Sequence, residues 1–336
     1  MSGWRSCSLT SVHHSSRLLA KVAGAGLDPH LALEGSGISL EAIHDLTTRI
    51  KITDEYAIYR NVLALLPDSG ISVDIGLNAR VSVYGMLGYL LLTAATLSDA
   101  LKAAADVPAL IANGFSMSLE TSNDLARLCF SDYSGAADLR FEYAEVALGS
   151  FKRTCSDILG QDLPLTRVGF EGACTQTCIE RCAGQFGCPV VSGQTQSFLE
   201  FPASFLDVVL PLADPISHLE VLELCRRQNS EFAAEREWLQ QVRDIISKTL
   251  AEPVPLEDIA DRLHCSSRTL RRRLGELKTN YRQLLDDVRF EKAKLMLKEG
   301  RLQTDEIAEK LGFCDGAGFR RAFQRWSGQP PGAYKT

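Results

Sequence analysis

The feature that most constrains the fold of this chain is a pattern that occurs twice in its last hundred residues. In each copy, a segment containing Ile-Ala and then Leu leads through a short turn into a second segment that is rich in arginine; the copies span residues 256–274 and 304–323. Apolar residues spaced three and four apart predict amphipathic helices. Two short helices joined by a tight turn form a helix-turn-helix, whose second helix enters the major groove of DNA. We therefore expect an all-α C-terminal part with two such units.

The first unit carries a dense set of candidate DNA contacts. Ser266 is a plausible N-cap for the second helix, and Leu270 and Leu274 form its core-facing stripe. Arginine recognises guanine with two hydrogen bonds or clamps a phosphate. The alternative is that an arginine-rich face is only a solvated surface. We predict that the contacting residues of this unit are Ser266, Ser267, Arg268, Thr269, Arg271 and Arg272.

The second unit repeats this arrangement with a different set of side chains. The turn at residues 311–314 precedes a helix whose aromatic residues face inward and whose polar face carries Arg320, Arg321, Gln324 and Arg325. Between the two units, residues 281–298 predict a helix of about 17 residues, or about 25 Å in length. That length suits two recognition helices placed about 34 Å apart, one turn of DNA.

The charge distribution agrees with DNA binding by the C-terminal part alone. The net charge of the whole chain is −6, but residues 237–336 hold 19 lysines and arginines against 15 acidic residues, whereas residues 1–236 hold 17 against 27. Attraction between exposed charges and phosphate falls off within about 10 Å at moderate salt. A basic C-terminal domain can therefore bind DNA beside an acidic N-terminal one.

The remainder of the chain predicts a domain of the α+β class. Residues 15–110 have helical periodicity, and the pattern then becomes ββαβαββ, with a hairpin at 115–130, helices at 138–159 and 174–184, and strands at 165–170 and 189–201. This order indicates a helical segment plus an antiparallel sheet. We expect domains at 1–215 (ligand sensing and dimerisation) and 237–336 (DNA binding). A helical connector is expected at 216–236, within a helix pair that continues to residue 250.

Targeting and membrane segments are not expected. The first ten residues lack the apolar core of a signal peptide. The most apolar run, 83–97, is shorter than the roughly 18 residues that span a bilayer. Ten cysteines without an export signal are expected to be reduced. The sequence thus predicts a cytoplasmic protein.

Four cysteines form a cluster that has two interpretations. Three of them recur every four residues, so that they share one helix face, and a fourth follows six residues later: Cys174, Cys178, Cys182 and Cys188. Clustered thiolates bind soft metals and form disulfides. The simpler interpretation, which we favour, is that these small apolar residues pack the helix onto the sheet. We accordingly expect no metal and no cofactor.

The C-terminal residues resemble the AraC/XylS family of bacterial transcription regulators. The matching segments are 266–274, 306–313, 319–328 and 330–334, within about the last 85 residues. The resemblance implies that Arg268, Arg271 and Arg272 contact the first groove, and that Gly316, Ala317 and Arg321 stand at the contact positions of the second.

Two departures from the family pattern weaken the second unit. Cys314 stands where the family has a capping serine, and Gly316 and Gly318 replace larger residues. Glycines in a helix cost up to about 1 kcal/mol each relative to alanine and offer no side chain to a base. We therefore predict that the first unit discriminates between DNA sequences, while the second adds phosphate affinity through Arg321 and Arg325.

The N-terminal part resembles the sensory domain of the ornithine-utilisation-regulator-like branch, a domain often described as arabinose-binding. The matching segments are 84–89, 96–100, 186–190 and 206–215. The resemblance implies a transcription activator, not an enzyme, that binds promoter DNA as a homodimer and acts on RNA polymerase. Its effector would be a small molecule such as an amino acid or another catabolite. No membrane partner is expected.

Three alternatives stay open on the sequence. The cysteine cluster would allow a redox- or metal-sensing regulator. A repair protein that accepts alkyl groups on cysteine would need a Pro-Cys-His-type run, which is absent. A constitutive DNA-binding protein would use its N-terminal domain for dimer assembly alone.

Overall fold

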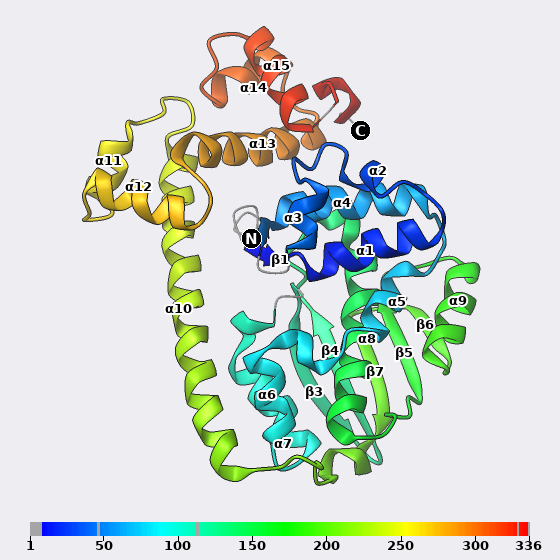
Figure 1. Ribbon diagram of the computed structural model, residues 1–336. Coiled ribbons are helices and arrows are strands. Elements are labelled where there is room, and N and C mark those ends of the chain that lie inside the picture. Colours follow the sequence, from blue (N-terminus) through cyan, green and yellow to red (C-terminus); the bar gives the residue numbers. More distant parts are fainter. Residues whose placement is uncertain (1–8, 46–47, 112–113, 328, 335–336) are drawn as a thin grey trace. The chain divides into compact units, whose positions relative to one another are not determined.

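The computed structural model describes residues 9–45, 48–111, 114–327 and 329–334 (Figure 1). The chain divides into two compact units, residues 10–233 and 234–336, which we call the N-terminal and C-terminal units. The leading residues 1–8, which bear on the signal-peptide prediction, and Gly328 of the family motif lie outside the described residues.

The first part of the N-terminal unit is helical, as predicted. Side-chain caps begin several of its helices: Ser39 Oγ accepts from the backbone of Ala42, and Thr96 Oγ1 accepts from the backbone of Asp99. The helices are α1 (His13–Gly24), α2 (Pro29–Leu33), α3 (Leu40–His44), α4 (Ile52–Leu65), α5 (Ile71–Leu77), α6 (Met86–Thr93) and α7 (Leu97–Asp106). Two short strands, β1 (Leu9–Ser11) and β2 (Arg49–Lys51), pair with each other.

The second part contains a five-stranded sheet in the order β3-β4-β7-β5-β6. Its strands are β3 (Ser116–Ser122), β4 (Leu125–Ser131), β5 (Arg167–Glu171), β6 (Val190–Gln194) and β7 (Ser197–Pro202), with α8 (Arg140–Leu159) and α9 (Gln176–Phe186) between them. The predicted hairpin is confirmed: Ser122 pairs with Leu125 across a two-residue turn in which Asn123 has a φ of 51°.

One strand pair differs from a purely antiparallel sheet. The pairs β3·β4, β4·β7 and β5·β7 are antiparallel, whereas β5 and β6 are parallel. The reason is that α9 connects β5 to β6, and a helical crossover returns the chain in the same direction. The predicted α+β class is confirmed, with one parallel pair at the edge of the sheet.

The helices α5 and α8 cross at two glycines. A Cβ atom at Gly76 would lie 2.5 Å from the carbonyl oxygen of Val146, and one at Gly149 would lie 3.0 Å from the carbonyl oxygen of Val73. Glycine is therefore required on both helices for this close approach. This contact, near the end of α5, holds α5 against α8, and both helices border the cavity described below.

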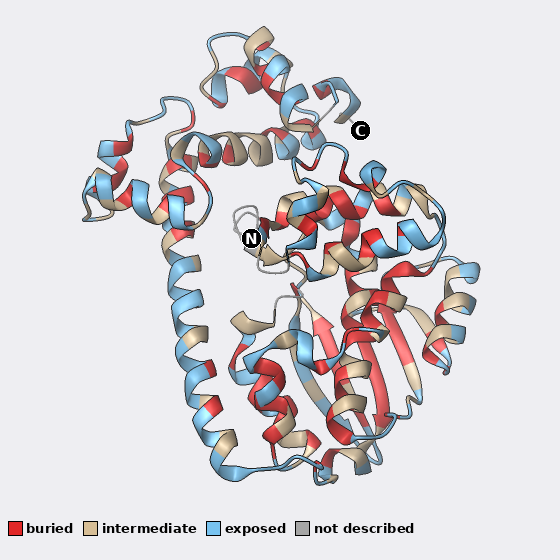
Figure 2. Ribbon diagram, viewed as in Figure 1, coloured by how far each residue is buried: buried red, intermediate tan, exposed pale blue. Residues whose placement is uncertain are grey.

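Two hydrophobic clusters form the core of the N-terminal unit. One packs α6, α7 and α8 against the sheet around Phe130, Phe170 and Phe201, and the other joins α1 and α4 around Leu18, Ile58 and Tyr59. Figure 2 shows β5 and β7 as buried and the edge strand β3 as largely exposed or half-buried.

A single long helix, α10 (Pro215–Lys248), leads from one unit into the other. The predicted helix pair is therefore wrong, because no glycine or proline interrupts residues 216–250. The boundary between the compact units falls inside α10, between Ala233 and Ala234.

The C-terminal unit is all-α, as predicted. It contains the second half of α10, then α11 (Leu256–Arg262), α12 (Ser267–Glu276), α13 (Tyr281–Glu299), α14 (Thr304–Lys310) and α15 (Gly316–Ser327), followed by a 3-10 turn at Pro331–Tyr334. One hydrophobic cluster includes residues of all six helices, among them Ile259, Leu270, Val288, Ile307 and Phe319. Within the described residues, no helix combines the length and apolarity needed to cross a membrane.

Candidate DNA interface and effector cavity

The turns of the two helix-turn-helix units begin in the same way. His264, the second residue after α11, has a φ of 51°, and Gly312, the second residue after α14, has a φ of 72°. In both turns the next residue closes a backbone hydrogen bond, Cys265 N to Ala260 O at 3.0 Å and Phe313 N to Ala308 O at 2.9 Å. The repeat seen in the sequence is thus a repeat of structure.

Ser266 caps the first recognition helix, α12. Its Oγ accepts a hydrogen bond from Thr269 N at 3.1 Å, which supports the capping role predicted from the sequence. Leu270 and Leu274 are buried, as expected for the core-facing stripe. The helix therefore presents its opposite face, with three arginines, to solvent.

The arginines of α12 differ in their partners. Arg268 is exposed and has no ion pair within the described residues. Arg271 pairs with Glu257 at 3.0 Å and Arg272 with Glu276 at 2.6 Å, all on exposed side chains. Exposed pairs of this kind are worth about 0–1 kcal/mol, so both guanidinium groups remain available to an anion. Arg273 instead lies over the ring of Trp238 at 4.0 Å and serves packing.

The cap of the second recognition helix, α15, lies one residue later than expected. Asp315 Oδ1 accepts a hydrogen bond from Gly318 N at 2.6 Å, so that Asp315 is the N-cap and Cys314 lies within the turn. The first turn has four residues between its helices and the second has five. The departure at Cys314 consequently leaves the helix capped.

The glycines at the start of α15 have different surroundings. Gly316 is buried, and a Cβ atom there would lie 1.8 Å from Asp305 Oδ1 on α14. Ala317 and Gly318 are half-buried. Any DNA contact at Gly316 would involve its backbone, and such a contact stays a prediction.

The rest of α15 is divided between core and solvent. Phe319 and Phe323 are fully buried, whereas Arg320, Arg321, Gln324 and Arg325 are exposed. Of these, Arg325 pairs with Asp286 of α13 at 3.1 Å. The predicted contact residues of both units, apart from the buried Gly316, thus lie at or near the surface of the C-terminal unit.

The N-terminal unit contains a cavity of about 460 Å³. It is bordered by the end of α4, the start of α5, the first turns of α8 and the start of α9. Apolar walls come from residues such as Leu63, Ile71, Phe115 and Phe141. Its volume is in the range of small-molecule sites. Its lining residues are spread from 63 to 197; two of them, Cys174 and Cys178, belong to the cysteine cluster singled out in the sequence, and none was predicted as an effector contact.

Acidic groups dominate the charge of this cavity. Five carboxylates and two guanidinium groups line it: Asp68, Asp138, Glu142, Glu145, Glu171, Arg140 and Arg181. Both arginines are paired, Arg140 with Glu171 and Arg181 with Glu145. Glu142 Oε2 is buried without a hydrogen-bond partner, and burial raises the pKa of this carboxyl group. Asp138 also pairs with Arg60, which lies outside the lining. Carboxyl groups thus outnumber guanidinium groups in the lining, and three of the five are paired.

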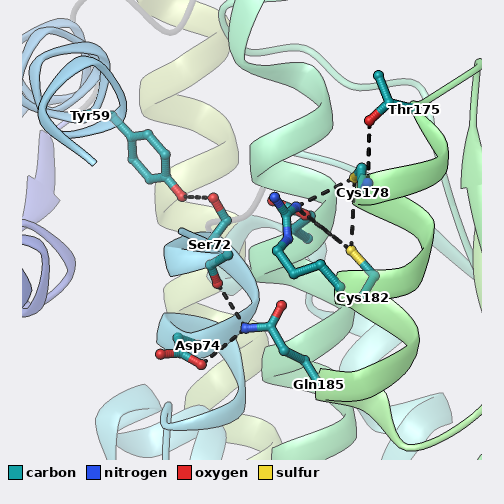
Figure 3. A network of polar contacts seen from close by, with 10 residues as sticks. Tyr59, Ser72, Asp74, Thr175, Cys178, Cys182 and Gln185 are labelled. Carbon is teal, nitrogen blue, oxygen red and sulfur yellow. Dashed lines mark hydrogen bonds and ion pairs between the residues drawn. The ribbon is translucent and has the colours of Figure 1, made fainter. Parts of the chain in front are cut away.

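The cysteine cluster is only partly assembled, and Figure 3 shows its two adjoining members, Cys178 and Cys182. Cys178 Sγ and Cys182 Sγ lie 4.0 Å apart, and Cys182 Sγ donates to Glu145 Oε1 at 3.3 Å. Within the described residues, these two thiols and Glu145 form a group whose ligand atoms lie within 4.8 Å of one another; Cys188 does not belong to it. Cys174 lines the cavity.

Two features of this group oppose the binding of a metal ion: a guanidinium cation lies beside its ligand atoms, and burial keeps its thiols protonated although that cation by itself lowers their pKa. The guanidinium group of Arg181 lies 2.5 Å from Glu145 Oε1 and 3.4 Å from Cys178 Sγ, and it occupies the centre of the group. Burial raises the pKa of Cys178 to about 11, and burial together with Glu145 raises that of Cys182 further. Protonated thiols are weak nucleophiles and weak ligands.

A polar network fixes α9 against α5, as Figure 3 shows. Gln185 Nε2 donates to Gly70 O at 3.0 Å and to Asp74 Oδ1 at 3.1 Å, and Tyr59 Oη donates to Ser72 Oγ at 2.8 Å. Thr175 Oγ1 caps α9 by accepting from Cys178 N. These bonds hold the helices that border the cavity.

The two helix-turn-helix units, with exposed arginines on α12 and α15, define a class of protein: a helix-turn-helix DNA-binding protein with an α+β domain attached. Comparison with known families makes this specific. Residues 26–210 match the model for the arabinose-binding domain of AraC transcription regulators, and residues 259–336 match a helix-turn-helix domain. The chain therefore belongs to the AraC family of transcription regulators.

Known relatives agree with this assignment. The ornithine utilization regulator of Pseudomonas aeruginosa is 27% identical over 327 residues, which cover 97% of this chain and 96% of that protein. The transcriptional regulator VqsM of the same species is 28% identical over 272 residues, 76% of this chain and 81% of that one. The crystal structure of CdpR from Pseudomonas aeruginosa covers 96% of this chain and 98% of its own at 22% identity and a TM-score of 0.48.

Proposed function

We propose that this protein is a transcription activator that binds promoter DNA as a homodimer in the cytoplasm and is controlled by a small-molecule effector in the 460 Å³ cavity. The observation that carries the proposal is the separation of two surfaces. The C-terminal unit exposes arginines on α12 and α15, and the N-terminal unit encloses an acidic cavity that no residue of the C-terminal unit lines. Control of this kind needs a coupling of typically about 1–3 kcal/mol between the two sites.

The DNA-binding part of the proposal assigns different roles to the two recognition helices. Arg268, Arg271 and Arg272 of α12 read bases, and Arg321 and Arg325 of α15 bind phosphates. Ser266, Ser267, Thr269, Gly316, Ala317, Arg320 and Gln324 complete the proposed contact set. Support comes from the first three residues of α15, Gly316, Ala317 and Gly318, which have no polar side chain that could read a base.

The test uses fragmented genomic DNA to obtain the operator, followed by binding to operator and scrambled duplexes. We expect Arg272→Ala to reduce the preference for the operator by a factor that corresponds to about 1–3 kcal/mol. Arg321→Ala should weaken both duplexes alike. Arg301→Ala, which removes an exposed arginine between α13 and α14, controls for the loss of charge. Loss of discrimination in Arg321→Ala, with discrimination intact in Arg272→Ala, would refute the division of roles.

The charge of the cavity favours an effector with a cationic group and an aliphatic body. An ammonium group would neutralise the excess of carboxylates, and the apolar walls would hold the methylenes. One relative is named as the ornithine utilization regulator of Pseudomonas aeruginosa, and ornithine is therefore the first probe. We expect ornithine to raise the melting temperature of the protein, as any ligand of the native state does. Norvaline, of the same length but without the side-chain amine, should not do so; an equal effect of both would argue against a cationic effector.

A second candidate, a regulator that senses soft metals through its thiols, has one observation in its favour, the proximity of Cys178, Cys182 and Glu145. Cadmium titration of the reduced protein distinguishes it. A thiolate charge-transfer absorption that is lost in Cys178→Ser would support this candidate, and its absence in the native protein would eliminate it.

A further inference from the structure

A second cavity, of about 340 Å³, lies within the C-terminal unit between α13 and α15. Four of its lining residues are arginines and one is acidic: Arg282, Arg289, Arg321, Arg325 and Asp286. Leu285, Phe313, Gly318 and Ala322 supply the apolar wall. The whole chain has a net charge of −6, whereas the side chains that line this cavity have a net positive charge.

The charges of this cavity are mostly uncompensated. Arg325 pairs with Asp286, the one carboxylate present. Arg289 donates to the carbonyl oxygens of Leu311 and Gly312 and lies over the Phe313 ring at 4.6 Å, which leaves its charge without a carboxylate. Neither Arg282 nor Arg321 has an ion pair or side-chain hydrogen bond within the described residues.

The position of Arg282 adds to this imbalance. It is the second residue of α13, a 19-residue helix with no acidic residue in its first turn. The amino-terminal end of a helix carries partial positive charge and disfavours a cation there. Arg282 therefore gains nothing from its own helix, and an anion in the cavity would be attracted by the guanidinium groups and by the helix end together.

We propose that this cavity is a binding site for a phosphate group, and that its occupant is one backbone phosphate of DNA beside the second recognition helix. The inference rests on the proposed DNA binding and extends it, because it assigns Arg282 and Arg289 of α13 to the interface. Guanidinium groups bind phosphate oxygens with two parallel hydrogen bonds. The apolar wall suits the sugar carbons on either side of a phosphodiester.

The experiment compares Arg282→Ala with Arg301→Ala, a substitution of the same charge outside the cavity. Binding to operator and scrambled duplexes is measured by fluorescence anisotropy at several salt concentrations. We expect Arg282→Ala to weaken binding to both duplexes by the same factor, on the order of tenfold. The slope of log K against log salt should fall by about 1, as for the loss of one phosphate contact. Arg282→Lys, which keeps the charge but not the fork of donors, should recover part of the affinity.

A second measurement, the melting temperature of the protein without DNA in increasing inorganic phosphate or pyrophosphate, distinguishes the two sources of a phosphate group. One outcome is that the melting temperature rises with phosphate in the native protein but not in Arg282→Ala, and that phosphate also competes with DNA. That result would confirm a phosphate-binding cavity and make a free phosphorylated metabolite its occupant in place of a DNA phosphate. If Arg282→Ala equals Arg301→Ala in affinity and slope, and phosphate has no effect, the site is refuted. If the native protein binds no DNA at all, the proposed function fails, and the melting experiment still tests the cavity by itself.

Discussion

Replacing Gly76 with alanine is expected to destabilise the N-terminal unit, because α5 and α8 cross where neither backbone has room for a side chain. A Cβ atom at Gly76 would lie 2.5 Å from the carbonyl oxygen of Val146 and 2.9 Å from the backbone nitrogen of Ser150. Ordinary contacts of a Cβ atom begin near 3.4 Å. The helix α5 would therefore have to retreat from α8 by about 0.9 Å, the difference between 3.4 and 2.5 Å.

The magnitude follows from two opposing effects. Overpacking a core costs about 1–3 kcal/mol, and we expect the upper end because the obstructing atoms belong to the backbone of a mostly buried helix. Alanine in place of glycine within a helix recovers at most about 1 kcal/mol. The net loss in the free energy of unfolding is then about 2 kcal/mol. For a unit of this size it corresponds to a fall in melting temperature of about 4–8 °C.

Urea denaturation followed by circular dichroism measures the effect. The matched control is Gly184→Ala on α9, in the same unit, where the added Cβ atom would meet nothing within 4 Å. This control should gain up to about 1 kcal/mol. The reasoning about the helix crossing is refuted if Gly76→Ala unfolds at the same urea concentration as the native protein, or a higher one, while Gly184→Ala is stabilised.

Two further predictions concern the cavity and the second recognition helix. Glu142→Gln should stabilise the protein at neutral pH, because burial raises the pKa of the Glu142 carboxyl group above 4.5. The folded state of the native protein therefore binds this proton more tightly than the unfolded state, and the stability of the native protein falls as pH rises from 4.5 through the raised pKa. The gain should vanish below pH 4.5 in pH-dependent denaturation; a gain that is independent of pH would contradict this assignment. Asp315→Ala should cost about 0.5–2 kcal/mol by removing the cap of α15. Thermal denaturation measures this loss, and Cys314→Ser should change the melting temperature little. A larger loss of stability in Cys314→Ser than in Asp315→Ala would instead make Cys314 the cap.

The parts of the fold that the sequence predicted well are those governed by local periodicity. Helical spacing predicted α12 and α15 with their buried leucines and phenylalanines, and strict alternation predicted the β3–β4 hairpin. Each of these elements depends on residues within about twenty positions of one another. The same locality explains why Ser266 was recognised as a cap.

Features that depend on one inserted residue or on distant partners were not predictable in this way. The second turn is one residue longer than the first, which moves the cap from Cys314 to Asp315 without any change in the pattern of apolar residues. The 460 Å³ cavity of the N-terminal unit joins Asp68, from the loop between α4 and α5, to Glu142 and Cys178, from the first turns of α8 and α9. The phosphate cavity likewise joins Arg282 to Arg321, 39 positions apart. Such groupings depend on tertiary packing, which the spacing of residues along the sequence does not predict.

The helix α10 is the covalent connection between the two units, and the free energy of breaking it can be compared with the coupling that the proposed control by an effector needs. Residues 230–235 of this helix are exposed on every side, so that only its own backbone hydrogen bonds hold this stretch together. Breaking a helix at one point removes about four of these bonds, each worth about 0.5–1.5 kcal/mol, a cost of about 2–6 kcal/mol. Allosteric coupling in proteins is typically about 1–3 kcal/mol. Because the cost of a break is about twice the coupling, we expect the connecting segment to stay helical under the proposed control.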